Sequence, residues 1–393
     1  MKAIETDVLD DGLRHLVACC RGDADDKRFV RSGSPDAFNS VVSLALRHRV
    51  VPQLFRAWSA MGLSSAVSPA ARERIEQLHL SCVARNAVLI EALKEAIELF
   101  GEVGIRAFPF KGPVLAQQLH GDAGARMLSD LDFLVHAADL RRARDVLLSA
   151  GWNDTRAMSA AAERAWFRAG WGCNLEHPDS DAIVNLRSAA TPDYLPGAIV
   201  WDALWEEREQ TTFEGCAAPM LPANALPVLL CWHGAKHAWS RLVWIADLDA
   251  FVRRGLVPDW ESVARKADRM GAGRLLRLGL LRTASVFGTP VPDELLDAAR
   301  RDVPVACVDY CRLRLTTRQP EAYRWWREQI FYLRSWEGAT ARSGQVLRIV
   351  FRPTITDYDA LNLPPGVDWL YGFLRPFRLT AKLAAKILKP RGR

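Results

Sequence analysis

An Asp-x-Asp pair at the start of an apolar run constrains this chain more than any other feature. Asp130 and Asp132 flank Leu131, and apolar residues follow from Phe133 onward. Residues i and i+2 of a strand point to one face, so the sequence predicts that both carboxylates project together while Leu131 and Phe133 pack behind them. Two neighbouring carboxylates repel unless a cation lies between them. Oxygen ligands of this kind suit Mg²⁺ or Mn²⁺, which predicts a metal site here.

A Lys-Gly turn precedes the Asp pair. Residues 105–110 read as a strand, and Lys111-Gly112 lead into a short helix. Glycine allows a tight turn, and a helix N-terminus offers unpaired N–H groups to a phosphate. We therefore expect Lys111 and Gly112 to bind phosphate; a lysine that only covers apolar surface is the alternative. Arg126, four residues before Asp130, either contacts a phosphate or forms a structural ion pair.

A strongly helical segment over residues 226–247 carries further candidates. We expect Lys236, His237 and Arg241 to lie on one face, turned toward the phosphate site or toward a second substrate. Asp247 either orients them or is satisfied at a contact between helices. His233 and His237 have the i, i+4 spacing of a helical zinc site. The segment lacks a metalloprotease glutamate and a third ligand, so zinc is not expected.

Together these segments resemble the uncharacterised nucleotidyltransferase family, part of the DNA-polymerase-β-like nucleotidyltransferase superfamily. The resemblance covers residues 80–255 and implies an α+β fold, with a small mixed β-sheet core embedded between N-terminal and C-terminal helical regions. It implies that Asp130 and Asp132 hold the metal that carries a nucleoside triphosphate. The matching pieces occur in the family's order: Phe110-Lys111-Gly112, Arg126, Asp130–Val135, Gly151-Trp152, and the His, Lys-His, Trp and Asp of segment 226–247.

The resemblance also implies a third carboxylate. Residues 171–176 and 182–188 read as two strands joined by a turn. Family members carry Asp-Leu-His or Glu-Leu-His on the second strand, whereas this chain reads Asn185-Leu-Arg. Asparagine cannot accept a proton at neutral pH, although its carbonyl ligates metals weakly. Glu176 and Asp181 remain open as substitutes for the missing carboxylate.

Inside the core, we expect a helix at 201–209 and a strand at 216–221. The rest of the chain is predicted to be mainly helical. The predicted organisation is an N-terminal helical region, a nucleotidyltransferase-like core, a C-terminal helical region, and a loop with a basic amphipathic tail, over residues 1–100, 101–222, 223–345 and 346–393.

The C-terminal tail carries positive charges only. No acidic residue follows Asp368, and an apolar stripe is formed by Leu379, Leu383 and Ile387. A basic amphipathic helix of this kind can lie on an anionic membrane surface, so peripheral membrane contact through residues 373–393 is one interpretation. Docking of the helix on its own domain is the other. The basic residues are Arg375, Arg378, Lys382, Lys386, Lys389, Arg391 and Arg393.

Composition excludes several other classes of protein. The net charge of +6 over 393 residues is modest, and nucleic acid is not expected as a partner. The 8 cysteines form no C-x-x-C, which argues against a disulfide framework or zinc ribbon. No apolar run reaches the length of a membrane span, and the N-terminus lacks a signal-peptide core. The expected location is cytoplasmic, with peripheral contact at the inner face of the membrane if the tail binds lipid.

These observations predict a metal-dependent nucleotidyltransferase using Mg²⁺ or Mn²⁺. It would move a nucleotidyl group from a nucleoside triphosphate to a hydroxyl of a small-molecule, sugar or peptide acceptor that the sequence does not name. Because Asn185 replaces the third carboxylate, the alternative is a catalytically degenerate nucleotide-binding or membrane-associated scaffold protein with the same fold.

Overall fold

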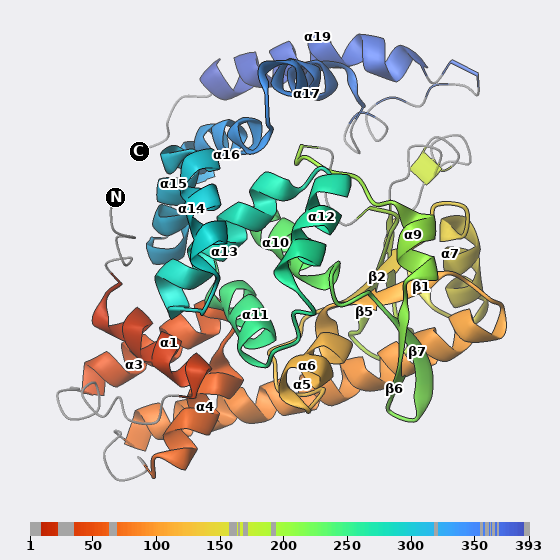
Figure 1. The fold of residues 1–393 in the computed structure, drawn as a ribbon. Coiled ribbons are helices and arrows are strands. Elements are labelled where there is room, and N and C mark those ends of the chain that lie inside the picture. The colour runs from red at the N-terminus through yellow and green to blue at the C-terminus, as the bar shows by residue number, and fades with distance from the viewer. Residues whose placement is uncertain are drawn as a thin grey trace.

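The computed structural model has an α+β fold in which helices surround a small mixed sheet (Figure 1), as predicted. Three of the basic tail residues, Lys389, Arg391 and Arg393, lie outside the described residues. Side chains of residues 382–388 are likewise not described. The structure describes residues 9–22, 35–62, 69–156, 163, 166–167, 172–189, 194–317, 321–353, 357, 361, 363, 366–367 and 369–388.

The N-terminal region is helical in its described part. One long helix, α5, runs along the lower edge of the molecule in Figure 1 and begins at a proline, the residue that best suits a first helical turn. It packs against α3 and α4 near its start and against α7 and strand β7 further on. This helix therefore ties the N-terminal helices to the sheet. The helices are α1 (Asp11–Arg21), α3 (Pro35–His48), α4 (Val51–Ala60) and α5 (Pro69–Glu102).

The five-stranded sheet has the order β1-β2-β5-β4-β3. Strands β2 and β5 run parallel, whereas the other neighbours are antiparallel. The helices α6 (Gly112–His120) and α7 (Leu140–Ser149) follow β1 and β2. The strands are β1 (Ala107–Phe110), β2 (Leu131–Val135), β3 (Asn153–Asp154), β4 (Cys173–Glu176) and β5 (Ile183–Arg187).

Alternation along β2 divides the interior into two cores. Leu131 and Phe133 are buried with residues of α5 and α7. Leu134 points the other way, into the core shared with the C-terminal helices, together with Phe108 of β1. The predicted packing of Leu131 and Phe133 behind the Asp pair is confirmed. Asp132 consequently emerges on the face that the C-terminal helices cover.

A hairpin with one polar strand corrects the interpretation of residues 201–221. The expected helix at 201–209 ends early, as α9 (Trp201–Glu206), and Glu209–Phe213 forms strand β6. β6 pairs with β7 (Cys216–Met220) in a separate two-stranded sheet. The turn uses Glu214 at φ 46° and Gly215 at φ 86°, the left-handed pair that a tight hairpin needs. β6 has almost no buried side chain, so its sequence lacks the alternation that marks a strand.

The helical segment at 226–247 is also broken, which corrects the expectation of one helix. Helix α10 ends at Lys236 and α11 begins at Leu242. Ala238 and Trp239 between them have φ of 48° and 52°. Trp239 N donates to Gly234 O at 2.8 Å, and a Cβ on Gly234 would lie 2.6 Å from the Trp239 ring. Close packing on this glycine therefore turns the chain.

The C-terminal helices surround the core that contains Phe108 and Leu134. They continue to the upper edge of Figure 1, where α17 and α19 lie side by side. No helix in the described ranges is long and apolar enough to cross a membrane. The helices are α10 (Leu226–Lys236), α11 (Leu242–Arg253), α12 (Trp260–Arg269), α13 (Gly273–Phe287), α14 (Asp293–Asp302), α15 (Val305–Thr316), α16 (Glu321–Ser335), α17 (Ala339–Phe351) and α19 (Trp369–Leu388).

Candidate functional site

The two aspartates converge at the start of β2. Parallel pairing sets Asp132 directly opposite Asn185 of β5. The Asn185 amide Nδ2 donates to Asp130 Oδ2 at 2.7 Å and to Asp132 Oδ1 at 3.2 Å. The Ser129 hydroxyl donates to Asp130 Oδ1 at 2.5 Å. Both carboxylates therefore share one donor, and the prediction that they project together is confirmed.

Lys111 supplies the positive charge that the carboxylate pair requires. Its Nζ lies 2.7 Å from Asp132 Oδ2 and 3.2 Å from His233 Nδ1. Burial alone would raise the pKa of Asp132, but the charge and hydrogen bond of Lys111 hold that pKa below its ordinary value. The Asp132 carboxylate is thus ionised at neutral pH, with an ammonium of the chain itself as its counterion.

The turn that carries Lys111 has an unusual backbone. Lys111 has φ 67° and ψ −141°, and Gly112 follows at φ 57°. A non-glycine residue with positive φ is costly and is tolerated where its surroundings fix it. Here the ion pair with Asp132 fixes the side chain, and Gly112 opens α6 with a conformation that suits glycine.

The residues at this point fit a divalent cation. Asp130 and Asp132 provide carboxylate oxygens, and turning the Asn185 amide by half a rotation would present its carbonyl oxygen to the same place. Hard oxygen donors of this kind are those that Mg²⁺ and Mn²⁺ prefer. Within the described residues no group of three His, Cys, Asp or Glu side chains forms a metal cluster. Glu176 and Asp181 are both exposed, and neither forms such a group with Asp130 and Asp132 among the described residues.

Arg126 forms a buried ion pair rather than an open cationic site. One guanidinium nitrogen lies 2.6 Å from Asp247 Oδ2, and both side chains are almost fully buried. Another donates to the Gly112 carbonyl at 3.5 Å. Burial raises the pKa of Asp247 even though Arg126 acts to lower it. The pair holds the Lys-Gly turn against α11, whereas a phosphate contact by Arg126 stays a prediction.

A cavity of about 1350 Å³ opens in front of the Asp pair. Eleven Lys or Arg residues line it against four Asp or Glu. Its near wall comes from the sheet and α10, and its far wall includes residues of α15, α17 and α19. Such an excess of positive charge in a hollow concentrates anions, and a polyphosphate is an anion of this kind.

Lys236 and His237 both line this cavity, at the end of α10. Burial, followed by repulsion from Lys111, lowers the pKa of Lys236. Within the described part of the chain Lys236 forms no ion pair. His237 stacks on Trp244 with ring centroids 4.6 Å apart, and burial lowers its pKa to about 3. Lys236 thus offers a charge, whereas His237 is neutral at pH 7 and offers hydrogen bonds only.

The model of the uncharacterised nucleotidyltransferase family matches residues 34–288. The chain belongs to this family. The match begins near the start of α3 and ends just past α13, so it reaches beyond the 80–255 of the sequence resemblance at both ends. Membership supports a general role in nucleotidyl transfer. No curated protein matches the chain.

The candidate site includes an arginine that the sequence did not predict. Arg49, between α3 and α4, donates to Ser129 Oγ at 2.7 Å and lines the cavity. Asp130 attracts its charge, although burial lowers the pKa of Arg49. Nothing in the local sequence marks this residue, because it lies 80 positions before Ser129. Its left-handed φ of 59° is visible only in the structure.

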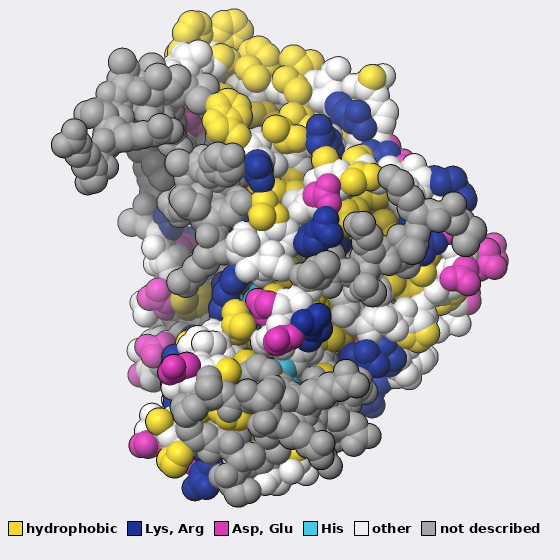
Figure 2. Space-filling model, turned by 90° about the vertical axis from the view of Figure 1, so that its left-hand side faces the viewer, with side chains coloured by type: hydrophobic (Ala, Val, Ile, Leu, Met, Phe, Trp, Pro, Cys, Tyr) yellow, Lys and Arg dark blue, Asp and Glu magenta, His cyan; other side chains and the backbone are white. Residues whose placement is uncertain are grey.

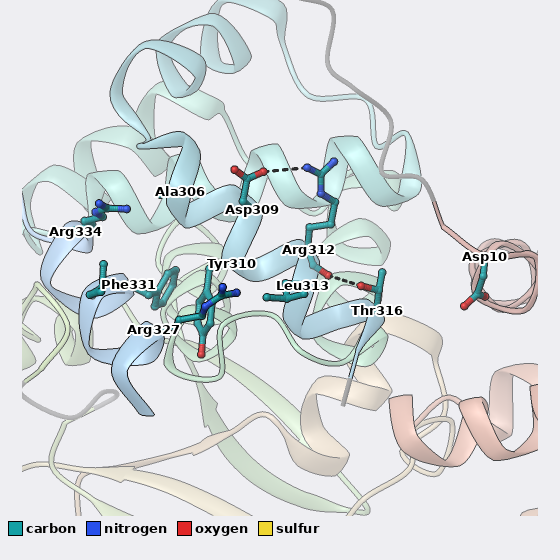
Figure 3. Close-up of a pocket in the computed structure, with 11 residues that line it drawn as sticks. Asp10, Ala306, Asp309, Tyr310, Arg312, Leu313, Thr316, Arg327, Phe331 and Arg334 are labelled. Carbon is teal, nitrogen blue, oxygen red and sulfur yellow. Dashed lines mark hydrogen bonds and ion pairs between the residues drawn. The ribbon is translucent and has the colours of Figure 1, made fainter. Parts of the chain in front are cut away.

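A second hollow, of about 800 Å³, lies between α15 and α16 away from the Asp pair (Figure 3). Arg312 pairs there with Asp309 at 3.0 Å, and the Thr316 hydroxyl donates to the Arg312 carbonyl at 3.1 Å. These polar groups satisfy one another. Asp130 and Asp132 line the larger cavity and not this one.

A buried neutral histidine, His48, predicts a loss of stability in acid. His48 is fully buried and accepts a hydrogen bond from Leu242 N at 3.3 Å; burial lowers its pKa from 6.5 to about 3. Below pH 6.5 the unfolded chain binds a proton that the folded chain excludes, so the unfolding free energy falls by about 1.4 kcal/mol per pH unit for each such group.

We expect His48→Asn, whose amide oxygen can still accept from Leu242 N, to lose less stability than the wild type between about pH 6 and about pH 4. Urea unfolding at several pH values measures both slopes. Equal slopes for the two proteins would contradict a buried neutral His48.

Proposed function

We propose that this protein is a metal-dependent nucleotidyltransferase that moves a nucleotidyl group from a nucleoside triphosphate to a hydroxyl of a small-molecule, sugar or peptide acceptor. The observation that carries the proposal is the convergence of Asp130 and Asp132 on one point at the start of β2, facing a cavity rich in Lys and Arg. Family membership supplies the reaction class.

Asp130 and Asp132 would hold Mg²⁺ or Mn²⁺, with the Asn185 amide oxygen as a weaker ligand. The bound ion supplies charge stabilisation to the phosphoryl oxygens. Lys111 neutralises Asp132 and borders the cavity, so its ammonium is placed to bind a phosphate oxygen as well. Gly112 opens α6, where the N–H groups of Gly112 and Val114 are donors for phosphate and Pro113 between them has none. Lys236 adds a second ammonium, and Arg126 keeps the turn in position through the Gly112 carbonyl.

Calorimetric titration with each of the four common nucleoside triphosphates, with and without Mg²⁺, tests this assignment. We expect Asp130→Ala/Asp132→Ala to weaken Mg²⁺-dependent nucleotide binding by about tenfold or more, because the variant lacks both charged ligands. Asp179→Ala/Asp181→Ala is a matched control, since these residues have the same spacing but lie exposed in a turn. Equal binding by wild type and the Asp130/Asp132 variant would remove these residues from the site.

The second candidate is a nucleotide-binding protein without turnover. It is favoured by one observation: Asn185 donates hydrogen bonds to both aspartates, where a third carboxylate would accept a proton from the acceptor hydroxyl. This candidate predicts nucleotide binding without pyrophosphate release across a broad panel of hydroxyl acceptors.

A further inference from the structure

An exposed apolar face runs along α17 and α19. Figure 2 shows hydrophobic side chains gathered at the upper edge, the height at which these helices lie in Figure 1. Trp369, Phe373 and Phe377 follow at intervals of four on α19 and are 66%, 66% and 68% exposed. Leu347 and Phe351 on α17 have the same spacing and are 58% and 49% exposed. The i, i+4 spacing places each set on one side of its helix.

The opposite side of α19 is fastened to the protein. The Arg375 guanidinium donates to the Ile349 carbonyl of α17 at 3.0 Å and forms an ion pair with Asp357. Arg378 pairs with the same aspartate at 2.6 Å. The aromatic side chains are therefore held outward by arginines that are anchored inward, and this face belongs to the folded protein.

This arrangement corrects the apolar stripe expected from the tail sequence. Leu379 lines the cavity in front of the Asp pair, so it does not join a surface stripe. Leu383 and Ile387 lie where side chains are not described. The exposed apolar residues of α19 are instead the earlier aromatic ones.

The charge of the two helices has one sign. Neither α17 nor α19 contains an aspartate or glutamate. Arg342 and Arg348 lie on α17 and are exposed. α19 contains Arg375 and Arg378, whose charges are paired with Asp357, and then Lys382 and Lys386.

We propose that the α17–α19 face docks on an anionic lipid bilayer. Aromatic side chains beside Lys and Arg are typical of segments that lie in the headgroup region, where rings bury their apolar part and cations pair with acidic lipids. No described helix meets the requirements of a membrane span, which agrees with contact from one side. A second copy of this chain is a poor occupant, because neither helix carries an acidic side chain that could pair with the Lys and Arg residues of the copy.

Vesicle flotation of the full-length protein tests the proposal. We expect binding to phosphatidylcholine vesicles that contain roughly a third phosphatidylglycerol, much weaker binding to pure phosphatidylcholine, and loss of binding as salt rises. Phe373→Ser/Phe377→Ser should reduce the bound fraction at limiting lipid by about tenfold or more, since two exposed rings no longer enter the interface.

Leu80→Ser/Val83→Ser is the matched control. These residues are 66% and 49% exposed on α5, so the variant removes exposed apolar surface elsewhere. It should bind vesicles like the wild type, and circular dichroism should show both variants folded. Equal flotation of the wild type and the Phe373/Phe377 variant would overturn the proposal, as would absence of binding to anionic vesicles. Lipid-free self-association that this variant abolishes would instead assign the face to a second copy.

Discussion

Arg126→Ala should lower the free energy of unfolding by about 3–5 kcal/mol, the cost of leaving a buried charge without its partner. The Asp247 side chain is 3% exposed. Without Arg126 its carboxylate would have no counterion at this contact, and the burial that raises its pKa would remain. The Gly112 carbonyl would also lose a donor. Urea unfolding near pH 7 measures the difference.

Two control variants distinguish the cost of leaving Asp247 unpaired from the cost of removing an arginine as such. Arg72→Ala removes an exposed partner of Glu76 and should cost less than about 0.5 kcal/mol. Arg126→Met/Asp247→Leu replaces the whole pair with apolar side chains and should recover most of the loss, because no charge remains buried. A cost of Arg126→Ala similar to that of Arg72→Ala would show that the pair does not stabilise the fold.

The pH dependence of the Arg126→Ala deficit has a definite sign. Removing the arginine raises the folded pKa of Asp247 further above its unfolded value, so the folded variant binds a proton that the unfolded chain releases. Its stability therefore falls as pH rises through that window. We expect the deficit relative to the wild type to be smaller at about pH 5 than at about pH 7.

Asn185→Asp should make the stability of the protein depend on Mg²⁺. The amide nitrogen that lies 2.7 Å from Asp130 and 3.2 Å from Asp132 becomes an oxygen that repels both. Without metal we expect a loss of about 2–4 kcal/mol, because two hydrogen bonds are replaced by like charges. With Mg²⁺ three carboxylates surround the cation, and the loss should be reversed. Thermal unfolding in chelator and in excess Mg²⁺ measures both.

The same variant separates the two candidate functions. A third carboxylate can accept the proton of an acceptor hydroxyl, a contribution of about a hundredfold or more in rate. If Asn185 is what prevents turnover, pyrophosphate release should rise in Asn185→Asp with nucleoside triphosphate and Mg²⁺.

Asn174→Asp serves as the control. Asn174 lies opposite Asn185 on β4 and its side chain accepts from Arg187, so the change adds a carboxylate to the same cavity away from the Asp pair. Its stability should not respond to Mg²⁺. An Asn185→Asp protein equally indifferent to Mg²⁺ would count against a metal site at Asp130 and Asp132.

The parts of the site that depend on local pattern could be predicted. Asp130 and Asp132 share a face because side chains alternate along any strand, and the Lys-Gly turn follows from glycine at a strand-to-helix junction. The mixed sheet between helical regions followed from the family resemblance. The resemblance implied that Asn185 occupies the place of the third carboxylate, and the parallel pairing of β2 and β5 sets it beside the pair.

The remaining features depend on contacts between distant segments. The break after Lys236 results from packing of Trp239 on Gly234, and both residues are compatible with a continuing helix when considered alone. Strand β6 is polar at every position except Phe213, so no periodicity marks it. Arg49 reaches Ser129 from another helical region. The Lys111–Asp132 ion pair joins two residues that were each predicted as site candidates, but their direct contact was not predicted.

Helices α17 and α19 each have one side that faces solvent and one side that faces the cavity. Outward they carry the exposed rings; inward, Arg348 and Arg352 of the α17 region and Arg375 and Leu379 of α19 border the cavity. A helix is only about 10 Å thick, so a layer of lipid headgroups against the outer side would lie one helix away from the cavity wall. The rate of encounter with an acceptor carried in that layer would then depend on the acceptor's surface density and lateral diffusion. The acceptor's concentration in solution would no longer set this rate.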